Sequence, residues 1–187
     1  MKLSKFVLGF CILISIFLIA IVVGFGSKFL IKEYVFPFKH KELIEKYSEE
    51  NNLDPYFVLA VIKAESKFNA DAKSHKDAYG LMQITEDTGK WVAGEMGLED
   101  FSKDKLYDEE YNIKLGCWYL NNLSEEFGDT DLVIASYNAG RGRVKGWLVN
   151  KKYSSDGKEL NYIPYKETEE YVEKVNNYYK IYKKLYD

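Results

Sequence analysis

The chain has 187 residues, of which 16% are aromatic, and 16 of these aromatic residues are tyrosines. Its formal net charge is −3. Residues 1–35 hold four of the 26 basic and one of the 29 acidic side chains, so residues 36–187 carry 22 basic against 28 acidic ones. A nucleic-acid-binding protein usually shows a basic excess or a basic stripe, and the composition excludes that class.

The N-terminal region contains one long apolar run. Residues 6–25 include no charged side chain, and twenty helical residues extend about 30 Å, the thickness of the hydrocarbon core of a bilayer. The run is longer than the usual signal-peptide core and has no A-x-A cleavage site, although Gly24-Phe25-Gly26 is a weak alternative site. We predict an uncleaved transmembrane anchor within residues 1–27, with a cleaved signal segment as the alternative, and a connector over residues 28–40.

Cysteine and histidine are scarce. Cys11 lies in the apolar run, so a disulfide with Cys117, the only other cysteine, is implausible. No Cys-x-x-Cys or Cys/His spacing occurs, and His40 and His75 are the only histidines. The sequence predicts neither a metal site nor a cofactor.

Residues 41–187 are predicted to form a single, mainly α-helical domain. Apolar residues recur there at helical spacing, and strand signals are few. Asp54-Pro55 is an N-cap residue followed by proline at the first helical position, which predicts a helix ending near Phe68. Asp108 and Gly128 are start and stop signals for a long helix. The other predicted helices cover residues 41–50, 85–97, about 131–138 and about 168–187.

Glu65 occupies an unusual position in the predicted helix 54–68. On a helical wheel it falls in the middle of an apolar arc, while Lys63 and Lys67 point elsewhere, into solvent. The arc is formed by Phe57, Val58, Val61, Ile62 and Phe68. Burying a glutamate without a partner is costly, so it needs an explanation. The wheel leaves two readings open: a structural glutamate paired with a basic residue such as Arg141, or a carboxyl whose pKa is raised by burial so that it can donate a proton.

Four short motifs follow one another along the chain. They are Glu65-Ser66-Lys67-Phe68, Gly80-Leu81-Met82-Gln83-Ile84, Ala135-Ser136-Tyr137-Asn138-Ala139-Gly140 and Glu167-Thr168-Glu169-Glu170-Tyr171-Val172. Each alone is weak, but in this order and spacing they resemble the SLT-type lytic transglycosylases of glycoside hydrolase family 23, which have a lysozyme-like fold. The resemblance covers roughly residues 42–178, and it favours the catalytic reading of Glu65.

The resemblance implies a set of site residues. Glu65 matches the family's single catalytic acid/base, and Ser66 the polar residue that helps to hold the substrate's acetamido group. Tyr137 and Asn138 match the pair that faces the cleavage subsite. The implied substrate-binding residues are Ser66, Gly80, Met82, Gln83, Tyr137, Asn138 and Tyr171.

The other implied roles concern the groove. Gly80 is expected to keep the backbone close to the sugar, where a Cβ would intrude. Met82 and Gln83 are expected to line the groove, and Tyr171 to form a hydrogen bond near the catalytic glutamate. Asp77, in a segment that is usually small and glycine-containing in the family, is expected to belong to a turn and not to contact substrate.

The implied reaction is cleavage of peptidoglycan strands without water. The glutamate protonates the oxygen between N-acetylmuramic acid and N-acetylglucosamine, then accepts the proton of the muramic acid C6 hydroxyl, which closes a 1,6-anhydro ring. The domain would then lie on the wall side of the membrane, or be secreted if the N-terminal segment is cleaved. Two alternatives remain: a hydrolase like goose-type lysozymes, whose aspartate position is occupied here by Thr85, and an inactive glycan-binding scaffold of a secretion or conjugation machine.

Overall fold

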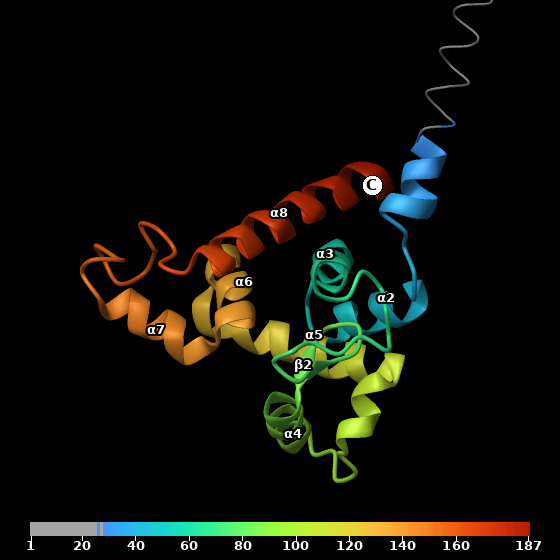
Figure 1. The fold of residues 1–187 in the computed structure, drawn as a ribbon, viewed down its shortest axis with the longest axis horizontal. Helices are drawn as coiled ribbons and strands as arrows, with labels where there is room; N and C mark the ends of the chain where they lie inside the picture. Colours follow the sequence, from blue (N-terminus) through green and yellow to red (C-terminus); the bar gives the residue numbers. More distant parts are fainter. Residues whose placement is uncertain (1–25, 27) are drawn as a thin grey trace, which may run out of the picture. The chain divides into compact units, whose positions relative to one another are not determined.

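The structure is a computed structural model that describes residue 26 and residues 28–187 (Figure 1). The described chain falls into two units that meet between Lys39 and His40. In the first unit, residues 28–35 are helical and end in the π-helical segment η1 (Ile31–Val35), just before Pro37. The predicted membrane anchor lies almost wholly outside the described residues. In the described part of the chain, no helix has both the length and the apolar character needed to cross a membrane.

The second unit, His40–Asp187, is mainly α-helical, as predicted. A short antiparallel pair of strands, β1 (Ala78–Tyr79) and β2 (Ile84–Thr85), pairs Ala78 with Thr85 and Tyr79 with Ile84. A 3-10 helix, η2 (Lys103–Tyr107), lies just before the helix that begins at Glu109. The α-helices are α2 (Lys41–Glu50), α3 (Pro55–Glu65), α4 (Glu86–Glu95), α5 (Glu109–Phe127), α6 (Thr130–Ala139), α7 (Arg141–Val149) and α8 (Lys166–Tyr186).

The predicted capping residues begin and end these helices. The carboxylate of Asp54 accepts a hydrogen bond from the Tyr56 backbone N–H at 2.9 Å, and Asp108 accepts one from that of Tyr111 at 2.8 Å. Gly128 ends α5 with φ 69°, a left-handed conformation that glycine adopts without strain. These three residues therefore mark the start of α3 and both ends of α5, as predicted.

Helix α3 ends three residues earlier than predicted. Glu65 is its last residue, and Lys67 and Phe68 adopt φ values of 53° and 65°. This left-handed turn still buries Phe68, which is 8% exposed. The expectation for Lys63 was also wrong: its ammonium lies 5.2 Å from the centre of the Tyr178 ring, and burial lowers its pKa. Lys67 is exposed, as expected.

Helix α7 was not predicted. Its sequence contains Gly142 and Gly146, which weaken helix propensity. Tertiary packing compensates, because Val144 and Trp147 are buried on one side of the helix.

Helix α3 forms the centre of this unit (Figure 1). It packs against α8 and α2, while α8 also packs against α6, and α5 contacts α2, α4 and α6. Every residue from Phe57 to Ile62 is buried, as expected for a helix that is apolar on all sides. The helix thus carries Glu65, at its C-terminal end, from the core to an open cleft.

Candidate active site

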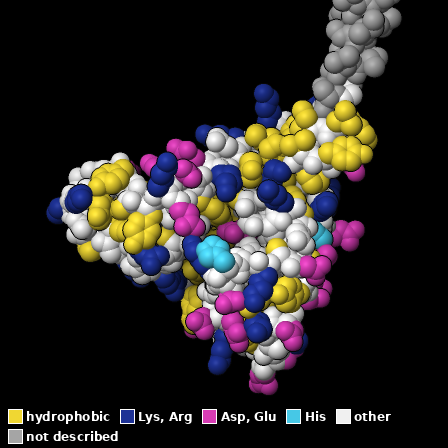
Figure 2. Space-filling model, viewed as in Figure 1, with side chains coloured by type: hydrophobic (Ala, Val, Ile, Leu, Met, Phe, Trp, Pro, Cys, Tyr) yellow, Lys and Arg dark blue, Asp and Glu magenta, His cyan; other side chains and the backbone are white. Residues whose placement is uncertain are grey.

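Glu65 lies in a cleft between several elements of the second unit. The cleft is bounded by the end of α3, the loop that precedes β1, the turn around Gln83, the end of α6 and the start of α8. Its lining residues are Glu65, Ser74, His75, Lys76, Ala78, Gln83, Thr85, Tyr137, Asn138 and Glu167. Figure 2 shows a hollow near the middle of this face, with a histidine and both acidic and basic side chains around it.

The carboxyl group of Glu65 is half-buried and held by one strong hydrogen bond. The Tyr171 hydroxyl donates to Glu65 Oε1 at 2.5 Å, and Tyr171 is itself only 6% exposed. Burial raises the pKa of Glu65 to about 7, although the Tyr171 hydrogen bond and the positive charges of Lys174 and Lys76 act in the opposite direction. Near neutral pH, a large fraction of this carboxyl is therefore protonated and able to act as an acid.

The alternative reading of Glu65 as a paired structural residue is wrong. Arg141 forms an ion pair with Glu126 at 2.8 Å, and Arg143 donates to the Ala139 carbonyl at 2.8 Å. Among residues 28–187, no ion pair involves Glu65. A carboxyl group with a raised pKa, open to a cleft, has the chemistry of a general acid.

Replacing Tyr171 with phenylalanine tests this electrostatic balance. The Tyr171 hydrogen bond stabilises the ionised form of Glu65, so its loss raises the pKa of the carboxyl further. A general acid acts in its protonated form, so for Glu65 in that role we expect the alkaline limb of the pH–kcat profile to move to higher pH in Tyr171→Phe. A limb at the same or lower pH would show that Tyr171 does not tune Glu65.

Tyr137 and Asn138 are brought to the cleft by the last turn of α6. The Tyr137 hydroxyl donates to the Met82 carbonyl at 2.7 Å, which leaves its oxygen available only as an acceptor. Asn138 Oδ1 accepts from the Thr168 hydroxyl at 2.9 Å, so its NH₂ group is the part available to donate. The two side chains therefore present opposite polarity to anything bound in the cleft.

The motif segment 80–83 forms a tight turn between β1 and β2. Gly80 has φ 75°, and a Cβ there would clash with the Leu106 carbonyl and the amide of Asn112. Both atoms belong to the protein interior, so the steric need for glycine comes from packing within the domain and not from a bound sugar. The expectation was that glycine at position 80 makes room for a sugar, whereas the structure shows that it makes room for Leu106 and Asn112.

Met82 also differs from the expectation that it lines the groove. Its side chain is fully buried and fills the space left by Gly116, where a Cβ would collide with the Met82 sulfur. Only its backbone reaches the site, through the carbonyl that accepts from Tyr137. Gln83 does line the cleft, with φ 51° and a side-chain NH₂ that donates to the Ala72 and Gly80 carbonyls.

Ser66 follows Glu65 as the C-cap of α3. Its hydroxyl donates to the Ile62 carbonyl at 3.3 Å, and Ser66 is not among the residues that line the cleft.

Asp77 belongs to a turn, as expected: its N–H donates to the Ser74 carbonyl, and its carboxylate pairs with Lys73 at 3.0 Å. The Asp77 carboxylate and the Ser66 hydroxyl therefore both lie outside the lining of the cleft.

Several cleft residues were not identified from sequence. Ser74, His75 and Lys76 come from the loop before β1, Ala78 is the first residue of β1, and Glu167 comes from the first turn of α8. A further residue, Asn112, is completely buried and joins the site to the core: it donates to the carbonyls of Tyr79 and Leu106 and accepts from the Met82 N–H. Its only sequence signal is a polar side chain on the apolar face of a long helix.

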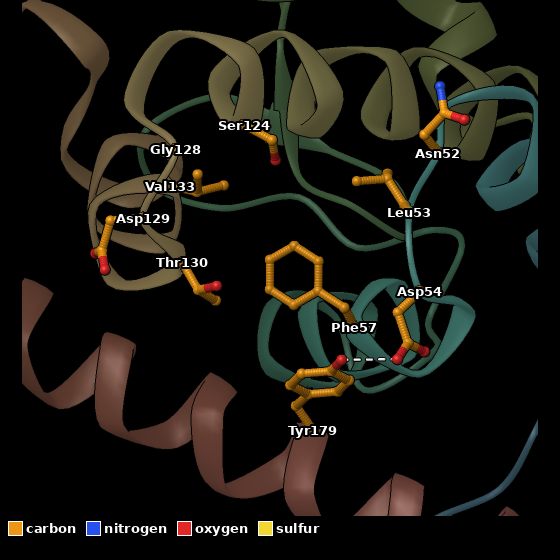
Figure 3. Close-up of a pocket in the computed structure, with 10 residues that line it drawn as sticks. All are labelled: Asn52, Leu53, Asp54, Phe57, Ser124, Gly128, Asp129, Thr130, Val133 and Tyr179. Carbon is orange, nitrogen blue, oxygen red and sulfur yellow. Dashed lines mark hydrogen bonds between the residues drawn. The ribbon is translucent and has the colours of Figure 1, made fainter.

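A second cavity lies at the other end of α3 (Figure 3). Phe57 points into it, and the Tyr179 hydroxyl donates to Asp54 at 2.7 Å. Asp54 also caps α3 and pairs with Lys183, and Asp129 caps α6. Ten helical rises, about 15 Å, separate the start of α3 from Glu65. Since its carboxylates are engaged in structural contacts, this cavity is not the candidate catalytic site.

Comparison with known proteins identifies the family. Residues 42–161 match the family described as the Transglycosylase SLT domain. The chain belongs to this family. The SLT domain match begins within α2 and extends to the segment between α7 and α8, so it includes Glu65, the 80–83 turn and the end of α6.

Individual relatives agree with this assignment. The chain is 33% identical over 146 residues to the soluble lytic murein transglycosylase of Escherichia coli K12, an alignment that covers 76% of this chain and 23% of that protein. It is 32% identical to a membrane-bound lytic murein transglycosylase C from Edwardsiella ictaluri, covering 79% and 47% of the two chains. The comparison with the crystal structure of the 70 kDa soluble lytic transglycosylase of Escherichia coli gives a TM-score of 0.71 at 30% identity. It covers 80% of this chain and 25% of that chain.

The structural similarity concerns the SLT domain and not the whole of those proteins. The chain spans about a quarter of the length of the Escherichia coli enzyme. Another solved relative, with a TM-score of 0.70 and 32% identity, is described as an inactive mutant of the lytic transglycosylase Slt from Pseudomonas aeruginosa in which a glutamate is replaced by glutamine. The observed helical unit is consistent with the expected lysozyme-like fold.

Proposed function

We propose that this protein is a peptidoglycan lytic transglycosylase in which Glu65 is the single acid/base. It cleaves the β-1,4 bond between N-acetylmuramic acid and N-acetylglucosamine and leaves 1,6-anhydro-muramic acid ends. The substrate is the glycan strand of the wall, and no metal or cofactor takes part. The observation that carries the proposal is the half-buried Glu65 carboxyl, whose pKa is raised to about 7 and which faces an open cleft.

A pKa near neutrality suits a group that works in both directions. Glu65 first gives its proton to the glycosidic oxygen and then, as a carboxylate, takes the proton of the C6 hydroxyl. The hydrogen bond from Tyr171 holds one carboxyl oxygen in place, which leaves the second oxygen for the substrate. The relative with an inactivating glutamate-to-glutamine change supports the same dependence on a single glutamate.

The neighbouring polar groups support charge stabilisation at the reacting centre. The Tyr137 O–H donates its hydrogen bond to the Met82 carbonyl, so the hydroxyl oxygen can only accept from, or offer lone pairs to, the substrate. Lone pairs are what an electron-poor C1 needs in the transition state. The NH₂ group of Asn138 complements this by donating to a substrate oxygen, because its own carbonyl oxygen is bound to Thr168.

One observation favours the hydrolase alternative. Glu167 supplies a second carboxylate in the cleft, and its pKa is lowered by the hydrogen bond and positive charge of Lys76. An ionised carboxylate opposite a protonated one is the arrangement of an inverting glycosidase. One fact favours the transglycosylase: Thr85, at the position of the hydrolase aspartate, uses its hydroxyl to cap α4.

The product of the reaction separates these two functions. Purified protein incubated with purified peptidoglycan should release muropeptides with 1,6-anhydro ends, which mass spectrometry distinguishes because they are lighter by one water than hydrated reducing ends. Mainly hydrated ends would establish the hydrolase and reject the transglycosylase. Strands that are bound without any cleavage would instead support the scaffold alternative.

We further propose that residues 1–27 anchor the protein in the cytoplasmic membrane with the domain on the wall side. The support is the uncharged run 6–25 and the existence of membrane-bound relatives. The native protein should fractionate with membranes and keep its N-terminal sequence, as read by mass spectrometry of the intact chain. Recovery of protein that starts near Ser27 in the medium would show that the segment is a cleaved signal.

A further inference from the structure

One ion pair joins the two sides of the Glu65 cleft. Lys76 Nζ lies 2.9 Å from Glu167 Oε1. Lys76 belongs to the loop that precedes β1, whereas Glu167 lies 91 residues later in the first turn of α8. Among the ion pairs of residues 28–187, this is the only one whose two partners both line the cleft that contains Glu65.

The pair is ionic but readily opened. The hydrogen bond and charge of Lys76 lower the pKa of Glu167, so that carboxylate is ionised at neutral pH. The two side chains are 59% and 70% exposed, and exposed ion pairs are weak because water screens them. The contact therefore contributes little to the stability of the fold.

A glycan strand is a long polymer, and it can reach Glu65 in two ways. A strand end can slide along the cleft while the pair is closed. An interior segment has to enter from the side, which requires Lys76 and Glu167 to separate. Since the pair connects two different elements that line the cleft, the loop before β1 and the start of α8, it distinguishes these two modes of entry.

We propose that Lys76 and Glu167 form an ionic latch across the cleft that favours strand ends over strand interiors. This inference rests on the proposed glycan-cleaving function. It makes Lys76 a specificity-determining residue that acts on how the strand is loaded. The charge of Lys76 also lowers the pKa of Glu65, and Lys76→Arg keeps that charge.

The same loop offers a matched control. Lys73 pairs with Asp77 at 3.0 Å, and these side chains are 53% and 72% exposed, much like the latch. Neither Lys73 nor Asp77 lines the cleft. Lys73→Ala therefore removes an equivalent surface ion pair from the same loop without opening the entrance.

The test compares full-length wild type, Lys76→Ala, Lys76→Arg and Lys73→Ala on long, end-labelled glycan strands. The chain-length distribution of early products separates cleavage near ends from cleavage at interior bonds. In Lys76→Ala we expect the share of interior cleavage to rise about two- to fivefold, the range of a weak surface pair. Lys76→Arg, which keeps the pair, and Lys73→Ala should resemble the wild type.

Salt provides a readout that a merely structural role would not move. Raising the ionic strength screens exposed charge pairs, so it should shift the wild-type distribution towards that of Lys76→Ala while leaving Lys76→Ala itself nearly unchanged. If the wild type cleaves strands but Lys76→Ala gives the same distribution at every salt concentration, the latch is overturned and the proposed function stands. If the wild type cleaves no strand at all, the proposed function is overturned and the latch falls with it.

Discussion

Glu65→Gln should reduce strand cleavage by at least about 10²–10⁴-fold, the usual contribution of general acid–base catalysis. The loss is at the upper end or beyond because one group serves both proton transfers in the proposed mechanism. Glutamine keeps the shape of the side chain and can still accept the hydrogen bond from Tyr171. The measurement is the rate of release of soluble muropeptides, with strand binding followed separately by co-sedimentation.

The substitution should not destabilise the protein. The folded-state pKa of Glu65 is about 7, above its ordinary value of 4.5, so the folded state binds the proton more tightly than the unfolded state. The corresponding stability is complete below about pH 4.5 and is lost as the pH rises through 7, up to about 3 kcal/mol. Because glutamine does not titrate, the melting temperature of Glu65→Gln should exceed that of the wild type increasingly between about pH 4.5 and pH 7, and the difference should level off at higher pH.

A matched control and a contrary outcome sharpen this test. Glu95 is also the last residue of its helix, α4, but it is exposed, so Glu95→Gln should change neither activity nor the pH dependence of stability. A Glu65→Gln protein that is destabilised yet still active would reject Glu65 as the acid/base, since that result is expected of a structural glutamate whose partner has been stranded.

Much of the helical frame could be predicted from local sequence. Asp54, Asp108 and Gly128 mark helix ends through short-range hydrogen bonds and backbone conformations, so a window of a few residues contains the information. The same holds for the anomaly of Glu65 on an apolar arc. Helix α7 could not be predicted in this way, because its two glycines oppose helix formation, and the burial of Val144 and Trp147 that offsets them depends on tertiary packing.

Within the site, the sequence could indicate which segments meet but not which way each side chain faces. Gly80 and Gln83 both have positive φ, and this turn directs the Met82 side chain into the core while its carbonyl holds Tyr137. A motif that is read as letters does not contain that geometry. The pairing of Lys76 with Glu167 is equally inaccessible, since it depends on how two segments 91 residues apart are brought together.

Asn112→Ala should cause the largest loss of stability among the substitutions considered. Its side chain is fully buried and satisfies three backbone groups: the carbonyls of Tyr79 and Leu106 and the N–H of Met82, at 2.9, 2.8 and 2.7 Å. Alanine would remove all three hydrogen bonds from the protein interior, and each such loss costs about 1–3 kcal/mol. We expect the free energy of unfolding to fall by about 3–5 kcal/mol, measured by urea denaturation.

The same helix provides the control for this prediction, and activity provides a second measurement. Asn121 donates to Glu125 at the surface of α5, so Asn121→Ala should change the free energy of unfolding by no more than about 0.5 kcal/mol. In Asn112→Ala, cleavage should fall even well below the melting temperature, because the turn that Asn112 holds supplies the Met82 carbonyl that orients Tyr137. A loss of stability under 1 kcal/mol, or full activity in a destabilised protein, would contradict the role of Asn112 as the link between the core and the cleft. If both losses occur together, the folding of this domain and the positioning of its site depend on the same three hydrogen bonds.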